Sequence, residues 1–302
     1  MTLSTQRERL LEPAVLAAIG RLDLVARVVV EGFLNGLHHS PYRGVAQEFA
    51  EHRPYIAGDE LRRIDWRVFA RTDRLYVKDF DEETNAPVRL LLDVSASLAY
   101  APRTISKLDY ARYLCAALAY LSIRQNDRVS LTCFSTEQRR SIPASGGQAH
   151  LHKLLATLQQ LRPAGQTLMG PSILREAAGW KRRGLVILIS DLYDDPPEVI
   201  GAVERLRRVG HDVIVFHLLD RAERELAHRG MIEFRDLETG ETLLADADQI
   251  RRAYIKRVDA TIELFEQEFA RAGTDYIALD TSEPLDKALA IYLRRRKGRR
   301  GR

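Results

Sequence analysis

From residue 86 onward, the chain alternates between short apolar runs and longer stretches with helical spacing. The apolar runs predict buried strands at 87–94, 127–134, 184–190, 212–218 and 275–279. Helices are expected between them at 106–124, 148–161, 170–179, 196–208, 247–272 and 284–295. Shorter strands are expected at 137–142, 231–235 and 241–244, the last two joined by a turn at Thr239 and Gly240. This alternation predicts an α/β fold, a Rossmann-like, doubly wound and mainly parallel sheet with helices on both faces.

The first 85 residues have a different pattern. Apolar positions have helical spacing over 7–39, where Gly20 and the pair Gly32 and Gly36 are expected to interrupt or end the helix. Residues 40–85 are dense in charged and aromatic side chains, a composition too aromatic for a disordered linker. We therefore predict four parts: a helical segment 1–39, a charged and aromatic segment 40–85 that packs on the main domain, the α/β domain 86–293, and a disordered basic tail 294–302.

The positive charge of the chain is concentrated at its end. Seven of the nine residues from 294 to 302 are Lys or Arg, and the whole chain has a net charge of +4, so the remainder carries −3. We interpret the tail as a solvated end, with weak attraction to nucleic acid or to an anionic membrane surface as the functional alternative. The acidic body argues against a specific nucleic-acid interface.

Other features favour a cytoplasmic protein. No apolar run reaches the roughly 18 residues of a transmembrane helix, and the N-terminus leads into no apolar region of the signal-peptide type. Cys115 and Cys133 fall in a helix-like and a strand-like segment. We interpret both as small core hydrophobes in a reducing compartment and not as a disulfide.

Oxygen-bearing side chains follow two of the predicted strands. Asp93, Ser95 and Ser97 occupy alternate positions where the first strand of the α/β domain ends, and ligands of open α/β sheets bind outside the carboxyl ends of strands. Thr167, in a loop that enters a helix, and Asp191, after the strongest strand pattern, can reach the same edge. Carboxylate and hydroxyl oxygens suit Mg²⁺, Mn²⁺ or Ca²⁺ better than zinc or copper.

The order Asp93-x-Ser95-x-Ser97, then Thr167, then Ser190-Asp191 resembles the metal-ion-dependent adhesion site of von Willebrand factor type A domains. The resemblance extends over roughly residues 86–280. It implies a Rossmann-like fold and a divalent cation, usually Mg²⁺, bound by the Ser95 and Ser97 hydroxyls and in some states by Thr167. Asp93 and Asp191 would act through water or as alternating direct ligands. Because neutral hydroxyls leave the cation much of its charge, such a site suits the capture of a partner's carboxylate.

The upstream segment resembles the signature of a second family. The matching residues are Ser40-Pro41-Tyr42-Arg43-Gly44, Glu48-Phe49, Arg53-Pro54-Tyr55, Gly58-Asp59-Glu60, Arg62, Ile64-Asp65-Trp66, Ala70-Arg71 and Leu75-Tyr76-Val77-Lys78. This string is similar to the bacterial domain-of-unknown-function family 58, whose members carry it just before a von Willebrand type A domain. Members are often encoded beside MoxR-type AAA+ ATPases, which implies a role as adaptor or co-chaperone of such an ATPase.

Two interpretations of residues 40–83 stay open. The cations of the segment can pair with its own acidic residues while Trp66 packs it onto the sheet, as a partly buried charged segment requires. Alternatively, exposed cations and aromatics form a docking surface for a protein partner. The candidate docking residues are Arg53, Tyr55, Arg62, Trp66 and Arg71.

We predict a non-enzymatic, metal-dependent protein-interaction module with a MoxR-type AAA+ ATPase as partner and no small-molecule substrate. The alternative is a metal-dependent phosphoesterase-type hydrolase, because an Asp after a first strand also begins phosphoaspartyl enzymes of the haloacid dehalogenase type. Those enzymes usually carry a second Asp two residues later, where this chain has Ser95. A Gly-x-x-x-x-Gly-Lys-Ser/Thr phosphate loop and a His-Glu-x-x-His metal motif are both absent from the sequence.

Overall fold

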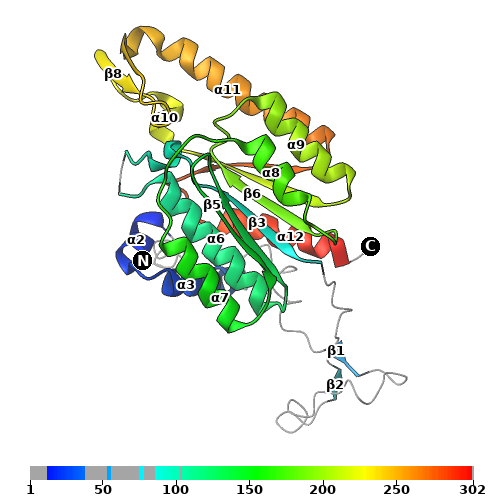
Figure 1. Ribbon diagram of the computed structural model, residues 1–302. Helices are drawn as coiled ribbons and strands as arrows, with labels where there is room; N and C mark the ends of the chain where they lie inside the picture. The colour runs from blue at the N-terminus through cyan, green and yellow to red at the C-terminus, as the bar shows by residue number, and fades with distance from the viewer. Residues whose placement is uncertain (1–11, 38–52, 56–74, 78–85, 103, 301–302) are drawn as a thin grey trace. The chain divides into compact units, whose positions relative to one another are not determined.

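The computed structural model of the chain describes residues 12–37, 53–55, 75–77, 86–102 and 104–300 (Figure 1). The chain divides into two units, one made of residues 1–32 and 86–292 and the other of residues 33–85 and 293–302. The first unit contains the α/β fold. Its second segment begins at Ala86, where the sequence predicts the α/β domain to begin, and the unit also takes in residues 1–32 of the expected helical segment.

A six-stranded sheet forms the centre of the first unit. In spatial order its strands are β10 (Asp275–Asp280), β7 (Asp212–Leu219), β6 (Leu185–Ser190), β3 (Val88–Asp93), β4 (Val129–Phe134) and β5 (Arg139–Ser145). The first five are parallel, and β5 pairs antiparallel with β4 at the edge. Every residue of β3 and β6 is buried, as parallel strands covered on both faces require. The predicted Rossmann-like, mainly parallel α/β fold is confirmed.

Helices cover the two faces of the sheet (Figure 1). On one face, α8 (Met169–Ala177), α9 (Pro196–Arg208) and α11 (Ala247–Arg271) share an apolar core with alternate residues of the central strands, such as Leu91 and Val186. On the other face, α6 (Lys107–Arg124) contacts β3, β4 and β7, and α7 (Gln148–Gln159) packs against α6. The intervening strand residues, such as Leu90 and Ile187, are buried there.

The remaining elements of the first unit connect or extend this core. A short 3₁₀ turn, η3 (Ala96–Ala99), follows β3, and α10 (Arg221–Glu225) follows β7. The hairpin of β8 (Met231–Arg235) and β9 (Thr242–Asp246) precedes α11, and α12 (Asp286–Arg300) begins after β10. In the second unit, β1 (Arg53–Pro54) pairs antiparallel with β2 (Tyr76–Val77).

The N-terminal helical segment differs in detail from its prediction. It contains two helices, α2 (Pro13–Ile19) and α3 (Leu22–Leu37), separated at Gly20, whose φ of +69° ends α2. Gly32 lies inside α3, although the sequence predicts an interruption there, whereas Gly36 is followed by Leu37, the last residue of α3. Burial of neighbouring apolar side chains such as Val29 and Phe33 outweighs the roughly 1 kcal/mol that a helical glycine costs.

The C-terminal helix also extends beyond its prediction. The sequence predicts an end at 295 and a disordered tail over 294–302, but α12 continues to Arg300. Arg and Lys are good helix formers, and cations are favourable at a helix C-terminus, so the basic run can continue the helix. In the described part of the chain, no helix is both long and apolar enough to cross a bilayer. Cys115 and Cys133 are free and buried, which confirms their interpretation as core side chains.

Candidate cation site at the carboxyl edge of the sheet

The order of the strands reverses between β3 and β6. From β3 the chain moves to β4 and β5 on one side, then crosses back to β6 on the other side. Doubly wound sheets bind ligands at such a switch point, outside the carboxyl ends of the strands. β3 ends at Asp93 and β6 ends at Ser190, and the two strands are direct parallel neighbours. The topology therefore brings the two predicted acidic positions to the same edge.

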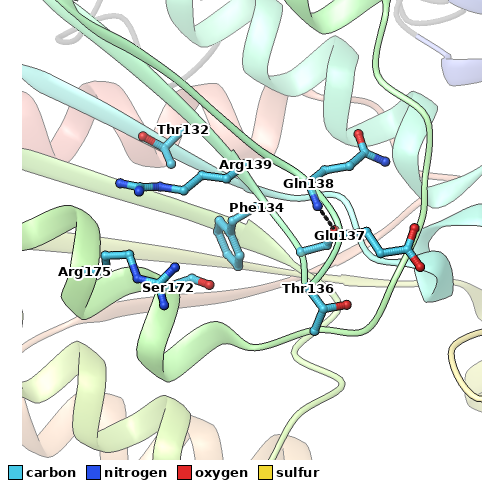
Figure 2. A pocket seen from close by; sticks show the side chains of 9 residues that line it. Thr132, Phe134, Thr136, Glu137, Gln138, Arg139, Ser172 and Arg175 are labelled. Atoms are coloured by element: carbon cyan, nitrogen blue, oxygen red, sulfur yellow. Dashed lines mark hydrogen bonds between the residues drawn. The ribbon is translucent and has the colours of Figure 1, made fainter.

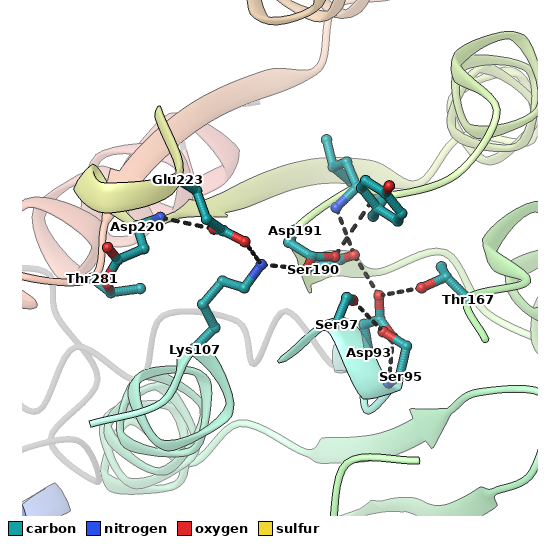
Figure 3. A network of polar contacts seen from close by, with 12 residues as sticks. Asp93, Ser95, Ser97, Lys107, Thr167, Ser190, Asp191, Asp220, Glu223 and Thr281 are labelled. Carbon is teal, nitrogen blue, oxygen red and sulfur yellow. Dashed lines mark hydrogen bonds and ion pairs between the residues drawn. The ribbon is translucent and has the colours of Figure 1, made fainter. Parts of the chain in front are cut away.

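Asp93 is the centre of a buried polar cluster (Figure 3). Its side chain is fully buried, and Oδ1 accepts a hydrogen bond of 2.9 Å from the backbone N–H of Ser95. Oδ2 accepts one of 2.6 Å from the Ser190 hydroxyl and a longer one of 3.4 Å from the Thr167 hydroxyl. Burial and the nearby charge of Asp191 raise the pKa of Asp93 to about 7, although the hydrogen bonds oppose that shift.

The two serines of the motif face each other. Ser95 is fully buried and precedes η3, and its hydroxyl lies 3.0 Å from the hydroxyl of Ser97. The tight turn of η3 brings the two side chains together directly after the end of β3 (Figure 3). Either hydroxyl can donate in this pair, so each retains lone pairs for another partner.

Thr167 reaches the cluster because its loop is tied to the turn after β3. The backbone N–H of Ala96 donates to the carbonyl oxygen of Gly165 at 2.8 Å. Gly165 has a φ of +75°, and a Cβ there would lie 2.5 Å from Oγ1 of Thr136, so only glycine fits this crossing. The Thr167 hydroxyl donates more closely to Oε1 of Glu238, at 3.0 Å, than to Asp93.

Asp191 is paired with a buried lysine. Nζ of Lys107, the first residue of α6, lies 2.7 Å from Oδ2 of Asp191 and 2.8 Å from Oε1 of Glu223. Lys107 and Asp191 are about 95% buried. Burial alone would raise the pKa of Asp191, but the ammonium of Lys107 outweighs it and lowers that pKa. Burial likewise acts to lower the pKa of Lys107, and the two carboxylates raise it above its usual value.

The lysine connects the cluster to the far strands of the sheet. Glu223 closes the first turn of α10, whose N-cap is Asp220. Oδ2 of Asp220 accepts a hydrogen bond of 2.7 Å from the hydroxyl of Thr281, which follows β10 (Figure 3). A continuous polar network therefore extends across the carboxyl edge from β3 to β10.

The donor set fits a hard divalent cation. The cluster brings together two carboxylates and the hydroxyls of Ser95, Ser97 and Thr167, all of them oxygen donors of the kind that Mg²⁺ prefers. Within the described residues, no Lys, Arg or His side chain forms an ion pair with Asp93. Groups of three or more His, Cys, Asp or Glu side chains arranged to hold a metal do not occur in that part of the chain either.

The structure thus brings together the side chains of Asp93, Ser95, Ser97, Thr167 and Asp191, as the sequence predicts. Their role as metal ligands remains a prediction. Lys107, Glu223 and Glu238 also belong to the site and were not predicted from the sequence. Lys107 and Glu238 lie 84 and 71 positions from their partners Asp191 and Thr167, and no local pattern marks Lys107, Glu223 or Glu238. Ser190 belongs to the sequence motif but is not among the five predicted ligands, and in the structure its hydroxyl donates to Asp93.

The candidate docking residues give a different result. Arg62, Trp66 and Arg71 lie outside the described residues. Arg53 belongs to β1, and the backbone N–H of Tyr55 donates to the carbonyl oxygen of Leu75 at 2.9 Å. The docking role of these residues remains a prediction.

A separate pocket lies beside the hairpin of β4 and β5 (Figure 2). It has a volume of about 170 Å³ and is lined by polar side chains around Phe134, with Arg139 and Arg175 on the side of α8. Arg139 pairs with Glu176 at 2.8 Å. The pocket is smaller than the roughly 300–1,000 Å³ of typical small-molecule sites, and none of the five predicted ligands lines it.

The fold and the cluster define a doubly wound α/β domain with an oxygen-rich site at its switch point. The chain belongs to the family described as "Protein of unknown function DUF58", whose model matches residues 51–263. This match confirms the resemblance that the upstream segment indicates. It covers residues 51–85 of the charged and aromatic segment together with most of the α/β domain.

Similar proteins come from mycobacteria. "Uncharacterized protein Rv1480" of Mycobacterium tuberculosis (strain ATCC 25618 / H37Rv) is 29% identical over 236 residues, which cover 76% of this chain and 73% of that protein. "Uncharacterized protein Mb1516" of Mycobacterium bovis has the same identity and coverage.

Among solved structures, BatB from Bacteroides thetaiotaomicron is 18% identical with a TM-score of 0.49, covering 70% of this chain and 98% of that one. The SpRpn10 VWA domain is 12% identical with a TM-score of 0.44, covering 68% and 93%. The family assignment rests on the sequence match alone.

Proposed function

We propose that this protein is a non-enzymatic interaction module whose candidate site binds Mg²⁺ and thereby captures an Asp or Glu side chain of a protein partner. One observation carries the proposal: the side chains of Ser95, Ser97, Thr167 and Asp191 lie together with that of Asp93, a buried carboxylate without a cationic partner among the described residues. A buried carboxylate in that state is costly, and a divalent cation would offset the cost.

Each residue of the cluster has a separate task in this proposal. Ser95, Ser97 and Thr167 would hold the cation with neutral oxygens, and Asp93 and Asp191 would supply the negative charge. When bound, the ion would supply a positive charge that attracts an external carboxylate. Ser190 orients Asp93 through its 2.6 Å hydrogen bond. Lys107 keeps Asp191 ionised and balances part of its charge, so the protein part of the site is not strongly anionic.

The hydrolase alternative finds less support in the geometry. Asp93 is fully buried and accepts hydrogen bonds on both of its oxygens, which leaves it poorly placed as a nucleophile. The position two residues later, where phosphoaspartyl enzymes carry their second Asp, is a buried serine. Turnover of p-nitrophenyl phosphate with Mg²⁺ or Mn²⁺ that is abolished by Asp93→Asn would instead establish the hydrolase.

The proposed partner is a MoxR-type AAA+ ATPase in the cytoplasm. This part of the proposal is supported by the family resemblance. The experiment is affinity capture from source cells with the full chain, in Mg²⁺ and in EDTA. The variants are wild type, Ser95→Ala/Ser97→Ala, and Ser141→Ala as a control that removes an exposed hydroxyl on β5.

Retention of a AAA+ ATPase by wild type and by Ser141→Ala in Mg²⁺, with loss in EDTA and in the double variant, would support the proposal. Equal retention in every condition would contradict metal-dependent capture. The candidate docking residues of segment 40–83, beginning with Arg53 and Tyr55, would then be the first to mutate.

A further inference from the structure

The turn of the β8–β9 hairpin carries a carboxylate to the candidate site. Residues 236–241 form this turn, in which the backbone N–H of Asp236 donates to the carbonyl oxygen of Glu241 at 2.9 Å. Oδ1 of Asp236 accepts hydrogen bonds from the N–H groups of Glu238 at 2.7 Å and Thr239 at 3.2 Å. The turn is therefore fixed by its own side chain, and it holds Glu238 in one place.

Glu238 accepts hydrogen bonds from Thr167 with both of its carboxylate oxygens. Oε1 accepts a hydrogen bond of 3.0 Å from the hydroxyl of Thr167, and Oε2 accepts one of 3.2 Å from its backbone N–H. The two residues are 71 positions apart in the chain, so the contact is tertiary and not a local turn. Thr167 is itself 6% exposed, and its hydroxyl also points toward Asp93 at 3.4 Å.

Glu238 adds a third carboxylate beside those of Asp93 and Asp191. No described Lys, Arg or His side chain pairs with Glu238, although the cluster beside it already contains the carboxylates of Asp93 and Asp191. A third negative charge at this edge is unfavourable unless a positive charge is close. The bidentate contact places Glu238 where a carboxylate from outside would have to approach Thr167.

We infer that Glu238 is an internal carboxylate that closes the candidate site, and that a partner's carboxylate must displace it. The inference rests on the proposed function, because it assigns Glu238 to the place of the partner's Asp or Glu. The β8–β9 hairpin is suited to move away from the site. It has only two strands, a marginally stable arrangement on its own, and exposes Met231, Leu243 and Leu244.

The test uses the full chain with Glu238→Ala, Glu238→Gln and, as a matched control, Glu241→Gln in the same turn. Glu241 is exposed and is the same residue type three positions along. Binding of Mn²⁺ is measured first, by electron paramagnetic resonance. A fluorescent peptide with one Glu among glycines is then titrated into the Mn²⁺-loaded protein, alongside a peptide with Gln instead of Glu.

The two readouts are expected to move in opposite directions. Loss of the Glu238 carboxylate should weaken Mn²⁺ binding about tenfold, as does loss of a group that supports a metal ligand. It should tighten binding of the Glu peptide about tenfold, the gain expected if the closed form is about 90% populated. The Gln peptide and the Glu241→Gln variant should show neither change. If the role of Glu238 is merely structural, its substitution should weaken both Mn²⁺ binding and Glu peptide binding.

The outcomes separate the inference from the proposed function. If wild type binds no Mn²⁺, the proposed function fails and the inference fails with it. If wild type binds Mn²⁺ and Glu peptide binding to both Glu238 variants is unchanged or weaker, the inference alone is overturned. Glu238→Gln retains the size of the side chain, so a thermal unfolding scan of this variant excludes misfolding as the cause of any change.

Discussion

Replacement of Lys107 by Met should destabilise the protein strongly. Lys107 is 4% exposed and its ammonium lies 2.7 Å from Asp191 and 2.8 Å from Glu223, so the substitution leaves two carboxylates without their counter-charge. Removal of one partner from a buried ion pair costs about 3–5 kcal/mol. The side chain of Glu223 retains 29% exposure and can be hydrated, which places the expected loss near the lower limit, at about 3 kcal/mol.

Urea unfolding at neutral pH in EDTA measures this loss directly. A change of about 3 kcal/mol corresponds to a decrease in Tm of about 6–12 °C for a domain of this size class. Lys153→Met is the matched control, because Lys153 is exposed on α7 and its loss should change the free energy of unfolding by no more than about 0.5 kcal/mol. A loss below about 1 kcal/mol for Lys107→Met would refute the assignment of Lys107 as the necessary counter-charge of the site.

Three further predictions concern titration and backbone geometry. The pKa of Asp93 is raised to about 7, so the folded state retains a proton that the unfolded state loses above about pH 4. In EDTA, the free energy of unfolding of wild type relative to Asp93→Asn should therefore decrease as pH rises from about 4 to 7. Urea titrations that show no decrease would contradict this prediction. Burial lowers the pKa of His217 to about 4, so stability relative to His217→Gln should increase as pH rises from 4 to about 6.5, which the same titrations test. Gly165→Ala should lower the free energy of unfolding by at least about 1 kcal/mol and weaken Mg²⁺ binding, because φ at this position is +75° and the new Cβ would clash with Thr136. An unchanged calorimetric titration of Mg²⁺ would argue against a role of this loop crossing in the site.

Much of the fold was predictable because each element of the α/β core has a strong local signal. The runs at 88–93 and 185–190 are apolar throughout, and in the structure both are fully buried strands. The motif residues could be placed at one edge because parallel strands end on the same side. The break expected at Gly32 was wrong because tertiary burial decides whether a helix tolerates glycine, and a local pattern contains no such information.

The parts of the site that were not predicted depend on contacts across long stretches of chain. Lys107 meets Asp191 across 84 positions, and Glu238 meets Thr167 across 71. Neither residue differs in sequence from an ordinary surface charge at a helix start or in a hairpin turn. Only the packing of α6 and of the β8–β9 turn over the edge of the sheet gives each its partner.

Isothermal titration of Mg²⁺ into the full chain would show whether the cluster around Asp93 binds a divalent cation. The comparison is wild type against Ser95→Ala/Ser97→Ala, which removes two neutral oxygens and leaves every charge in place. We predict one Mg²⁺ per chain for wild type and no measurable binding to the double variant, with both proteins folded by circular dichroism. Equal binding to both proteins, or no binding to wild type, would contradict this expectation.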